Sequence, residues 1–572
     1  MKKLFPLLIV SLLIVVAMSS CSSLDISDKL TLPSYTEAPT ETEAPTEPPR
    51  DPDEMFKFKK NEDDSYSVTG LVDTAMTEFI IPETYKGLPV TSIGEEAFID
   101  CMTVTSVIMP DSILTINKSA FEGCKNLTSV TFSSSLTTVC ESAFYWCTSL
   151  EAVQLPETVT VIEKLAFKGC AKLADVTLSK NITVIGDCVF EECIRIKDII
   201  LPKALTSLGT GAFRGCTLLR SIIIPDGVSV IRNETFAGCG NLVTASMLNS
   251  SVRSIDDDAF RDCVNFEHVR LPKTLNHINL KAFTGCPLII KSENGIKYID
   301  TWALGSESEE ISGTLTFKEG TIGIGADAFK GQKLITEVIL PDTVTTISDS
   351  AFEKCSGITK ITLSSSLLKL RSKALMGCTG ITELSFGAEL ESIAKDALAN
   401  LNSLNSITID PANRNFTVEG NCLVEIVKNS VVRGCNNSEI PKYIITIADY
   451  AFSGSQMTTI TLPNSLVTIA PYAFSGCSRL SMVILPEKVT ELNEGIFFEC
   501  SDLAIVTITG KVSLIDRVCF GFCESLGTIK ADNTTKEEWE ASVAIANWDY
   551  KSGSYMVLCA NDETIMKPLH KT

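Results

Sequence analysis

The sequence predicts a β-rich solenoid of parallel short strands and tight helical turns, with about 23 residues in each coil. Phenylalanine recurs at a step of 23 residues, with one step of 24, at Phe98, Phe121, Phe144, Phe167, Phe190, Phe213, Phe236, Phe260 and Phe283. An aliphatic residue stands five positions before each of them, and a cysteine follows three positions after. A period this strict is typical of stacked units that bury their apolar faces on one another.

The period is interrupted twice and resumes each time. After the first gap it returns at Phe329 and Phe352, with Leu375 and Leu398 in the same place, and after the second at Phe452, Phe474, Phe497 and Phe520. We therefore expect the solenoid to span 90–530, with irregular modules near 287–326 and 399–446.

The segment 127–147, LTSVTFSSSLTTVCESAFYWC, predicts how one coil is built. Leu127, Val130 and Phe132 should point inward from a short strand, with the threonines between them facing solvent. Other coils place a proline where this strand ends, because proline cannot donate to a ladder. A second extended piece, LTTV, follows, and ESAFYWC then makes a tight turn that places Phe144 and Cys147 in the core.

The first 21 residues predict an exported, lipid-anchored protein. Two lysines precede an apolar run that is too short for a comfortable membrane span and is typical of a signal peptide. The ending Met18-Ser19-Ser20-Cys21 resembles the bacterial lipobox, with Met18 and Ser20 departing from its preferred residues. The resemblance implies that Cys21 becomes the lipidated first residue of the mature protein, anchored in the membrane by two chains. An ordinary secretory signal is the alternative.

Short segments flank the predicted solenoid. Residues 22–55 include TEAPTETEAPTEPPRDPDE, a composition rich in Thr, Glu and Pro that predicts a disordered stalk. Residues 56–89 alternate apolar and polar side chains and predict an N-terminal β cap, because the first coil otherwise exposes an apolar face. Residues 531–572 are expected to cap the other end.

The repeat pattern LxxVxLPxxVTxIGxxAFxxC resembles the BspA-type, or Treponema-type, leucine-rich repeat of bacterial surface proteins. The resemblance covers roughly residues 56–530, and DPANRNFTVEGNCLVE is similar to the family's interrupting modules. It implies a leucine-rich-repeat solenoid that acts as an extracellular, non-catalytic binding scaffold. Individual ligands do not transfer by resemblance, because the solvent-facing positions vary freely.

Composition excludes several classes of function. A net charge of −21 and a pI near 4.8 leave no basic face for nucleic acid. Only three histidines are present, and no phosphate loop, HExxH pattern or acidic calcium loop stands out. We therefore expect no catalytic residue, no cofactor and no metal. A Cys/His hydrolase would need a base close to its thiol, and we interpret the nearness of His268 and His277 to Cys263 and Cys286 as chance proximity on a repetitive scaffold. A hydrolase in the C-terminal segment is a distant alternative.

The 21 cysteines predict a ladder of buried free thiols. Fourteen of them follow the repeat position by three residues, where other coils hold Gln332, Leu401 or Ser455. Stacked neighbours about 4.8 Å apart have parallel Cβ vectors, which do not reach the roughly 3.8 Å Cβ separation of a disulfide. Cys422 and Cys435, in the second irregular module, are the pair for which a disulfide stays open.

Six residues are candidate ligand contacts. Tyr145 and Trp146 occupy turn positions that are charged or glycine in most coils, and Phe498 and Phe522 stand in equivalent positions. Exposed aromatic side chains are frequent anchors in interfaces and sugar sites. Ile200 and Ile223 face solvent on adjacent coils and would form an apolar patch. Ordinary strand and turn preferences are the alternative for all six.

The predicted function is that of a lipid-anchored scaffold on the extracellular face of the bacterial cell envelope. It would recognise an extracellular protein or glycan, such as matrix, mucin or other cells, through its repeat surface. The alternative is a structural spacer or cell-envelope organiser without a dedicated ligand.

Overall fold

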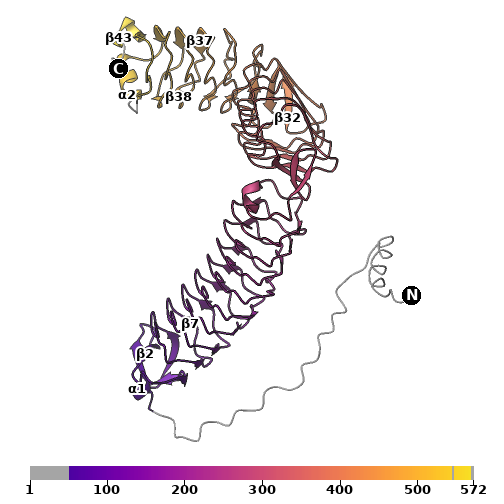
Figure 1. Cartoon of the computed structure of the whole chain (residues 1–572). Helices are drawn as coiled ribbons and strands as arrows, with labels where there is room; N and C mark the ends of the chain where they lie inside the picture. The colour runs from indigo at the N-terminus through magenta and orange to yellow at the C-terminus, as the bar shows by residue number, and fades with distance from the viewer. Residues whose placement is uncertain (1–50, 544–546, 568–572) are drawn as a thin grey trace, which may run out of the picture. The chain divides into compact units, whose positions relative to one another are not determined.

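The computed structural model describes residues 51–543 and 547–567, and within them the chain forms coil after coil of short parallel strands (Figure 1). The predicted signal peptide, Cys21 and most of the predicted stalk lie outside the described residues. No helix among the described residues has the length and hydrophobicity needed to cross a membrane.

One face of the solenoid, here the strand face, is formed by the first strand of most coils. These strands pair in parallel and in register, as Val153 pairs with Val176. They are β3 (Glu78–Ile80), β6 (Ser106–Ile108), β8 (Ser129–Thr131), β10 (Ala152–Gln154), β12 (Asp175–Thr177), β15 (Ser221–Ile223), β17 (Thr244–Ser246), β19 (His268–Arg270), β23 (Gly313–Thr316), β25 (Ile335–Ile339), β27 (Lys360–Thr362), β29 (Glu383–Phe386), β31 (Ser406–Ile409), β37 (Met482–Leu485), β39 (Ile505–Ile508) and β41 (Thr528–Ala531).

A second set of parallel strands comes from the next extended piece of each coil. Each is only two residues long, and its second residue is the aliphatic one that precedes the repeat position, phenylalanine or leucine, by five residues. They are β7 (Thr115–Ile116), β9 (Thr138–Val139), β11 (Val161–Ile162), β13 (Val184–Ile185), β14 (Ser207–Leu208), β16 (Val230–Ile231), β18 (Ser254–Ile255), β24 (Gly323–Ile324), β26 (Thr346–Ile347), β28 (Lys369–Leu370), β30 (Ser392–Ile393), β35 (Thr446–Ile447), β36 (Thr468–Ile469), β38 (Glu491–Leu492) and β40 (Leu514–Ile515).

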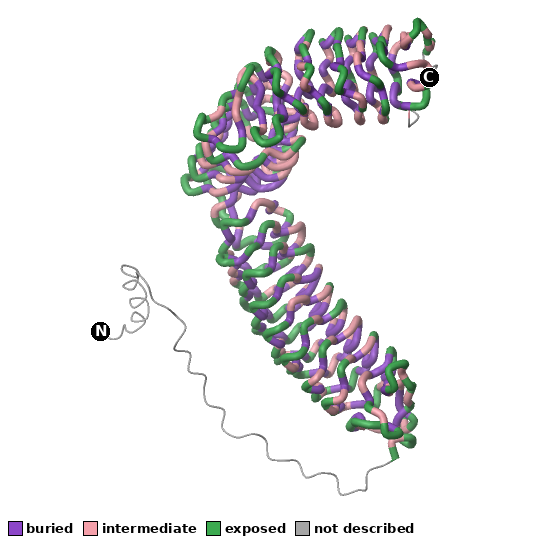
Figure 2. The backbone as a smooth tube through the Cα atoms, turned by 180° about the vertical axis from the view of Figure 1, so that it is seen from behind, coloured by how far each residue is buried: buried purple, intermediate pink, exposed green. Residues whose placement is uncertain are grey.

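The repeat phenylalanines are buried and stack on one another through the coils. The ring centroids of Phe121 and Phe144 lie 5.2 Å apart with the planes 3° from parallel. Phe213 is fully buried. Buried segments alternate with exposed ones along every coil in Figure 2. In the coil 127–147, Leu127 is buried as predicted, whereas Val130 and Phe132 are only half-buried.

The turn that carries each phenylalanine is held by two residues of left-handed backbone. In the coil of Phe121 these are Ser119, with φ 52°, and Gly123, with φ 71°. Most coils repeat the arrangement two residues before and two residues after the phenylalanine. The left-handed residues prevent a regular helix from forming, so the predicted tight turn is a run of hydrogen-bonded turns.

Each repeat cysteine makes a hydrogen bond as well as filling space. Cys124 Sγ donates to the carbonyl oxygen of Phe98 in the preceding coil at 3.0 Å, and Cys147 Sγ donates to that of Phe121 at 3.1 Å. Every cysteine in the described part of the chain is a free thiol, Cys422 and Cys435 included. The predicted ladder of free thiols is therefore present. The hydrogen bond from each thiol to a backbone carbonyl was not predicted, because the sequence indicated only that the position holds a small residue.

Two antiparallel modules interrupt the stack and divide its core. The first follows a short 3₁₀ turn, Leu280–Phe283, and contains β20 (Lys291–Glu293), β21 (Ile296–Ile299) and β22 (Trp302–Ser306). The second contains β32 (Phe416–Glu419), β33 (Cys422–Glu425) and β34 (Ser430–Gly434). Strand β33 is buried on both faces, with Leu423 in the core before it and Cys422 in the core after it. These modules are therefore partitions between successive hydrophobic cores.

Both ends of the described stack are capped. At the start lie α1 (Pro52–Met55), within the last residues of the predicted stalk, then β1 (Phe56–Lys60), β2 (Tyr66–Leu71), β4 (Thr84–Tyr85) and β5 (Leu88–Ile93). At the other end are α2 (Lys536–Ser542), β42 (Tyr555–Leu558), a 3₁₀ turn (Ala560–Asp562) and β43 (Thr564–Lys567). Trp548 is buried against Phe520 and closes the phenylalanine stack.

Candidate binding surfaces

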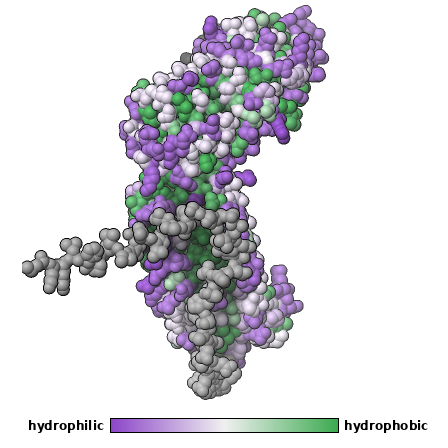
Figure 3. Space-filling model, turned by 90° about the vertical axis from the view of Figure 1, so that its right-hand side faces the viewer, coloured by the Kyte–Doolittle hydropathy of each residue, from purple (hydrophilic) through white to green (hydrophobic). Residues whose placement is uncertain are grey.

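The outward position at the end of each strand-face strand forms a row that crosses the coils. Polar side chains occupy it in most coils, as at Thr131, Gln154 and Thr177, which are all exposed. Ile200 and Ile223 occupy it on two adjacent coils and are 87% and 73% exposed. The predicted apolar patch therefore exists. On the face shown in Figure 3, hydrophobic residues gather in patches between larger hydrophilic areas.

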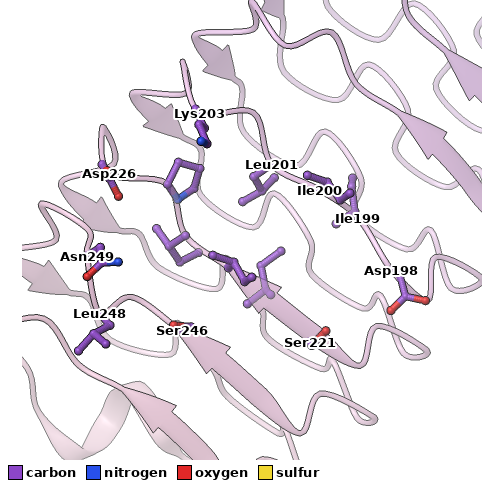
Figure 4. Close-up of a pocket in the computed structure, with 14 residues that line it drawn as sticks. Asp198, Ile199, Ile200, Leu201, Lys203, Ser221, Asp226, Ser246, Leu248 and Asn249 are labelled. Atoms are coloured by element: carbon purple, nitrogen blue, oxygen red, sulfur yellow. The ribbon is translucent and has the colours of Figure 1, made fainter. Parts of the chain in front are cut away.

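These two isoleucines belong to a hollow of about 640 Å³, here called the strand-face hollow. It is lined by residues of 198–203, 221–226 and 246–249. Leu248, which is 51% exposed, extends the apolar surface beyond them. Figure 4 shows Ile199, Ile200 and Leu201 between polar groups, with Lys203, Asp226 and Asn249 at one end and Asp198 and Ser221 toward the other. The hollow thus has an apolar floor and a polar rim, the usual composition of a binding site.

The strand ladder is interrupted where the hollow lies. Strand β12 pairs only with β10, and β15 only with β17, so the coil between them contributes no strand. Among the described residues, no backbone hydrogen bond joins the segment 198–201 to either neighbouring coil. Smaller hollows of about 400 Å³ and 350 Å³ lie at two further interruptions, lined by residues within 342–408 and 459–509. Three hollows thus lie where the strand ladder is interrupted.

Trp146 lies in a strained position on the turn edge of the coils. It has φ 59°, in the left-handed region that bulky side chains avoid, and most equivalent positions hold glycine. Its indole packs on Gly169 of the next coil, where an added Cβ would lie only 3.1 Å from Cδ1. The side chain remains 43% exposed, and Tyr145 contacts its edge with centroids 6.2 Å apart.

Phe498 and Phe522 belong to a longer set, here called the aromatic row: Tyr450, Tyr472, Phe498, Phe522 and Tyr550. Successive ring centroids lie 5.3, 6.2, 5.4 and 5.5 Å apart, so the row is continuous over five coils. Tyr550 is exposed, and the other four are half-buried. Lys551 Nζ lies 5.5 Å from the rings of both Phe522 and Tyr550.

A charged pair lies beside the aromatic row. The Tyr472 hydroxyl donates to Glu494 Oε1 at 2.7 Å, and Arg517 Nη2 donates to Glu494 Oε2 at 2.8 Å. Burial and the hydrogen bond to Glu494 raise the pKa of Tyr472 to about 12. Burial opposes ionisation of Glu494, but the hydrogen bonds from Arg517 and Tyr472 outweigh it and lower the pKa of that carboxyl. The tyrosine therefore stays neutral and the glutamate charged at physiological pH.

The structure offers no support for the alternative of thiol catalysis. Burial raises the pKa of most repeat cysteines, to about 12 at Cys239, which disfavours the nucleophilic thiolate. Cys286 differs, because its interaction with the Cys263 thiol lowers its pKa, but its Sγ donates to the carbonyl oxygen of Phe260 and not to a histidine. His268 is exposed beside Glu267, and His277 Nδ1 lies 2.8 Å from Asp349 Oδ2. Within 51–543 and 547–567, no cluster of three or more His, Cys, Asp or Glu is arranged to hold a metal.

The repeat model described as "BspA type Leucine rich repeat region (6 copies)" matches residues 72–197, 183–311, 307–422 and 425–539, most of the chain. The chain belongs to this family. The resemblance inferred from the repeat pattern is thus confirmed, and so is the solenoid of about 23 residues per coil. No curated protein matches this BspA-type chain.

Several solved structures resemble this BspA-type solenoid. A leucine-rich repeat protein from Bacteroides ovatus is 18% identical, with 87% of this chain and 98% of that chain covered and a TM-score of 0.34. A leucine rich cell surface protein from Faecalibacterium prausnitzii is 18% identical, with 88% and 100% covered and a TM-score of 0.27. A leucine-rich repeat protein from T. pallidum is 25% identical, with 36% and 90% covered and a TM-score of 0.27.

Sequence reasoning missed part of the turn-edge surface. It selected Phe498 and Phe522 but not Tyr450, Tyr472 or Tyr550, because these stand at different offsets from the repeat phenylalanine. The signal was available in the left-handed positions, which Tyr450 and Tyr472 also occupy with φ 56° and 58°. An aromatic side chain deviates from the repeat at either left-handed position, two residues before or two residues after the repeat phenylalanine.

Proposed function

We propose that this BspA-type chain is a non-catalytic, cell-surface scaffold that binds an extracellular protein, in the manner of an adhesin. The observation that supports the proposal is the strand-face hollow, where Ile200 and Ile223 are 87% and 73% exposed. Isolated exposed aliphatic residues are ordinary, but two on adjacent coils inside a hollow of about 640 Å³ form a contiguous apolar site.

The arrangement suits a protruding apolar side chain of a protein partner. The inward neighbours Ile199, Leu201, Ile222 and Ile224 are packed in the core and hold the floor rigid. Lys203 and Asp226 at the rim can hydrogen-bond with a partner's backbone or charged groups (Figure 4). An apolar centre within a polar rim is how protein interfaces concentrate their binding energy.

The test is a binding screen of the whole protein against collagen, fibrinogen, laminin, mucin and intact bacterial cells. We expect one saturable interaction that Ile200→Asp weakens at least tenfold. Thr131→Asp places the same charge at the same outward position three coils away and should leave the affinity unchanged. Silence of the folded protein across the panel would favour the alternative of a structural spacer.

We also propose that the protein is held on the cell surface by lipidation of Cys21. The lipobox-like ending Met18-Ser19-Ser20-Cys21 supports this proposal. Cys21→Ser should release the protein from the membrane fraction into the medium, whereas the native chain stays with the membrane. Equal retention of both proteins would contradict lipid anchoring.

A further inference from the structure

The aromatic row from Tyr450 to Tyr550 is a second departure from the repeat, far along the chain from the strand-face hollow. We propose that the row is a binding site for an extended, neutral glycan chain. The proposal is independent of the protein ligand assigned to the hollow, because it rests on other residues and on another edge of the coils.

Three of the five residues of the row occupy backbone positions that disfavour a large side chain. Tyr450, Tyr472 and Phe522 have φ 56°, 58° and 59°, in the left-handed region where side chains with a Cβ are destabilised. Glycine is the commonest residue at the Phe522 position in other coils, and serine, aspartate or glutamate often stand at the Tyr450 position. Bulky residues in strained positions indicate that some other requirement maintains them.

The rings are fixed in place before any ligand arrives. Tyr472 packs on Gly495 of the next coil, where an added Cβ would lie 2.4 Å from Cε1. Phe498 packs in the same way on Gly521, at 3.1 Å from Cδ2. Binding on such a surface loses little side-chain entropy.

The linear form of the row, with one ring per coil, favours a polymer over a globular partner. The row has one ring per coil over five coils, with successive ring centroids 5.3 to 6.2 Å apart. A linear polymer with a short repeat presents the same group to each coil in turn, whereas the surface of a globular protein has no such period. The site therefore suits a chain laid along the solenoid.

The chemistry of the row fits the two sides of a sugar ring. The polarised C–H bonds of a pyranose are attracted to the negative faces and π density of aromatic rings. Its hydroxyls can bond with the paired carboxylate and guanidinium of Glu494 and Arg517 and with the hydroxyl of Tyr550. Exposed carboxylates at Glu499 and Glu524, on a protein of net charge −21, oppose a polyanion, so the glycan should be neutral.

The experiment is isothermal titration calorimetry of the whole protein with cellohexaose, laminarihexaose and xylohexaose, and with heparin as a polyanion. We expect at least one neutral hexasaccharide to bind saturably, more tightly than its disaccharide, and heparin not to bind. Phe522→Gly should weaken binding at least tenfold without unfolding the protein, because glycine is the commonest residue at that position. Glu192→Gly, at the equivalent left-handed position of another coil, should have no effect.

Three results would overturn the proposal. The first is no binding of any neutral hexasaccharide at millimolar concentration by protein whose circular dichroism shows it to be folded. The second is equal affinity of the native protein and Phe522→Gly, with Tyr550→Ala as a second row variant that also leaves the affinity unchanged. The third is loss of a protein ligand, but of no glycan, in the row variants, which would assign the row to a protein partner instead.

Discussion

The strand-face hollow and the aromatic row depart from the same repeat in opposite ways. In the hollow, Ile223 ends a strand and Ile200 occupies the matching outward position of an extended segment, where the backbone accepts almost any residue. In the row, Tyr472 and Phe522 occupy left-handed turn positions that disfavour every residue with a large side chain. The residues of the hollow differ from the repeat in hydrophobicity and cause no backbone strain. Tyr472 and Phe522 of the row differ from the repeat in size and occupy strained backbone positions.

The difference shows how strongly a residue that deviates from the repeat indicates a functional site. Where a substitution is nearly neutral for folding, an unusual residue needs a second feature, here the hollow and the interrupted ladder, before it indicates a site. Where a substitution is destabilising, the residue itself is a stronger indication. By this measure Trp146, with φ 59° and its indole half-exposed on Gly169, is as strong a candidate for a functional residue as Phe522.

The largest predicted effect tests whether the core beneath the two surfaces is the same. Phe213, below the hollow, and Phe497, below the row, are both fully buried. Phe213→Ala and Phe497→Ala should each lower the free energy of unfolding by about 3–5 kcal/mol, the usual cost of truncating a buried aromatic side chain. Chemical denaturation followed by circular dichroism measures this; a cost near zero at either position would show that its ring is not in the core.

The next effect concerns the junction of the first core with the second. Asp349 Oδ2 accepts hydrogen bonds from His277 Nδ1 at 2.8 Å and from Arg371 Nε at 2.9 Å. Burial opposes ionisation, but these bonds lower the pKa of Asp349 to about 2. Asp349→Asn should therefore cost about 1.5–3 kcal/mol at neutral pH, the range for hydrogen bonds to a charged group.

The stability that the ionised Asp349 carboxyl contributes should decrease at acidic pH. Because the folded pKa lies below the unfolded one, the ionised carboxyl contributes its full stability above about pH 4 and loses it as the pH falls toward the folded pKa. The difference in unfolding free energy between the native protein and Asp349→Asn should thus shrink between about pH 4 and pH 2. A difference that stays constant over this range would show that the ion pair is not the cause.

The fold was predictable from the sequence because it repeats. The positions of Phe144 and Cys147 follow from the 23-residue period, and a period of that strictness admits few architectures. The contact of His277 with Asp349 was not predictable, since 72 residues and an antiparallel module separate them. Nor was the cysteine hydrogen bond, because a buried small residue is equally consistent with simple packing.

The candidate surfaces were predictable only in part, for a related reason. The outward direction of Ile200 and Ile223 follows from strand alternation, and the structure confirms it. The hollow depends on a missing strand in the coil at 198–201, and the residues there give no sign of it. The aromatic row depends on rings at different turn positions meeting in space, which the period alone does not show.

A smaller effect distinguishes the hollow from the rest of the strand face without any knowledge of its ligand. The fluorescent dye bis-ANS binds exposed apolar sites, so the native protein should increase its emission. Ile200→Asp should reduce that emission severalfold, and Thr131→Asp should not. Because all these side chains are exposed, we expect unfolding free energies to change by less than about 0.5 kcal/mol. Equal dye emission from both variants would show that the hollow is not a distinct apolar site on the strand face.

The smallest effect separates strain from packing in the aromatic row. Phe522→Gly relieves a left-handed aromatic residue, worth about 1–2 kcal/mol, and loses edge contacts with Phe498 and Tyr550 worth about 0.5–1.5 kcal/mol each. The two terms nearly cancel, so the free energy of unfolding should change by less than about 1 kcal/mol. Trp146→Gly loses fewer aromatic contacts and should therefore be the less destabilising of the two. Urea unfolding of both variants decides this, and a cost above about 2 kcal/mol for Phe522→Gly would mean that packing, and no ligand, accounts for the row.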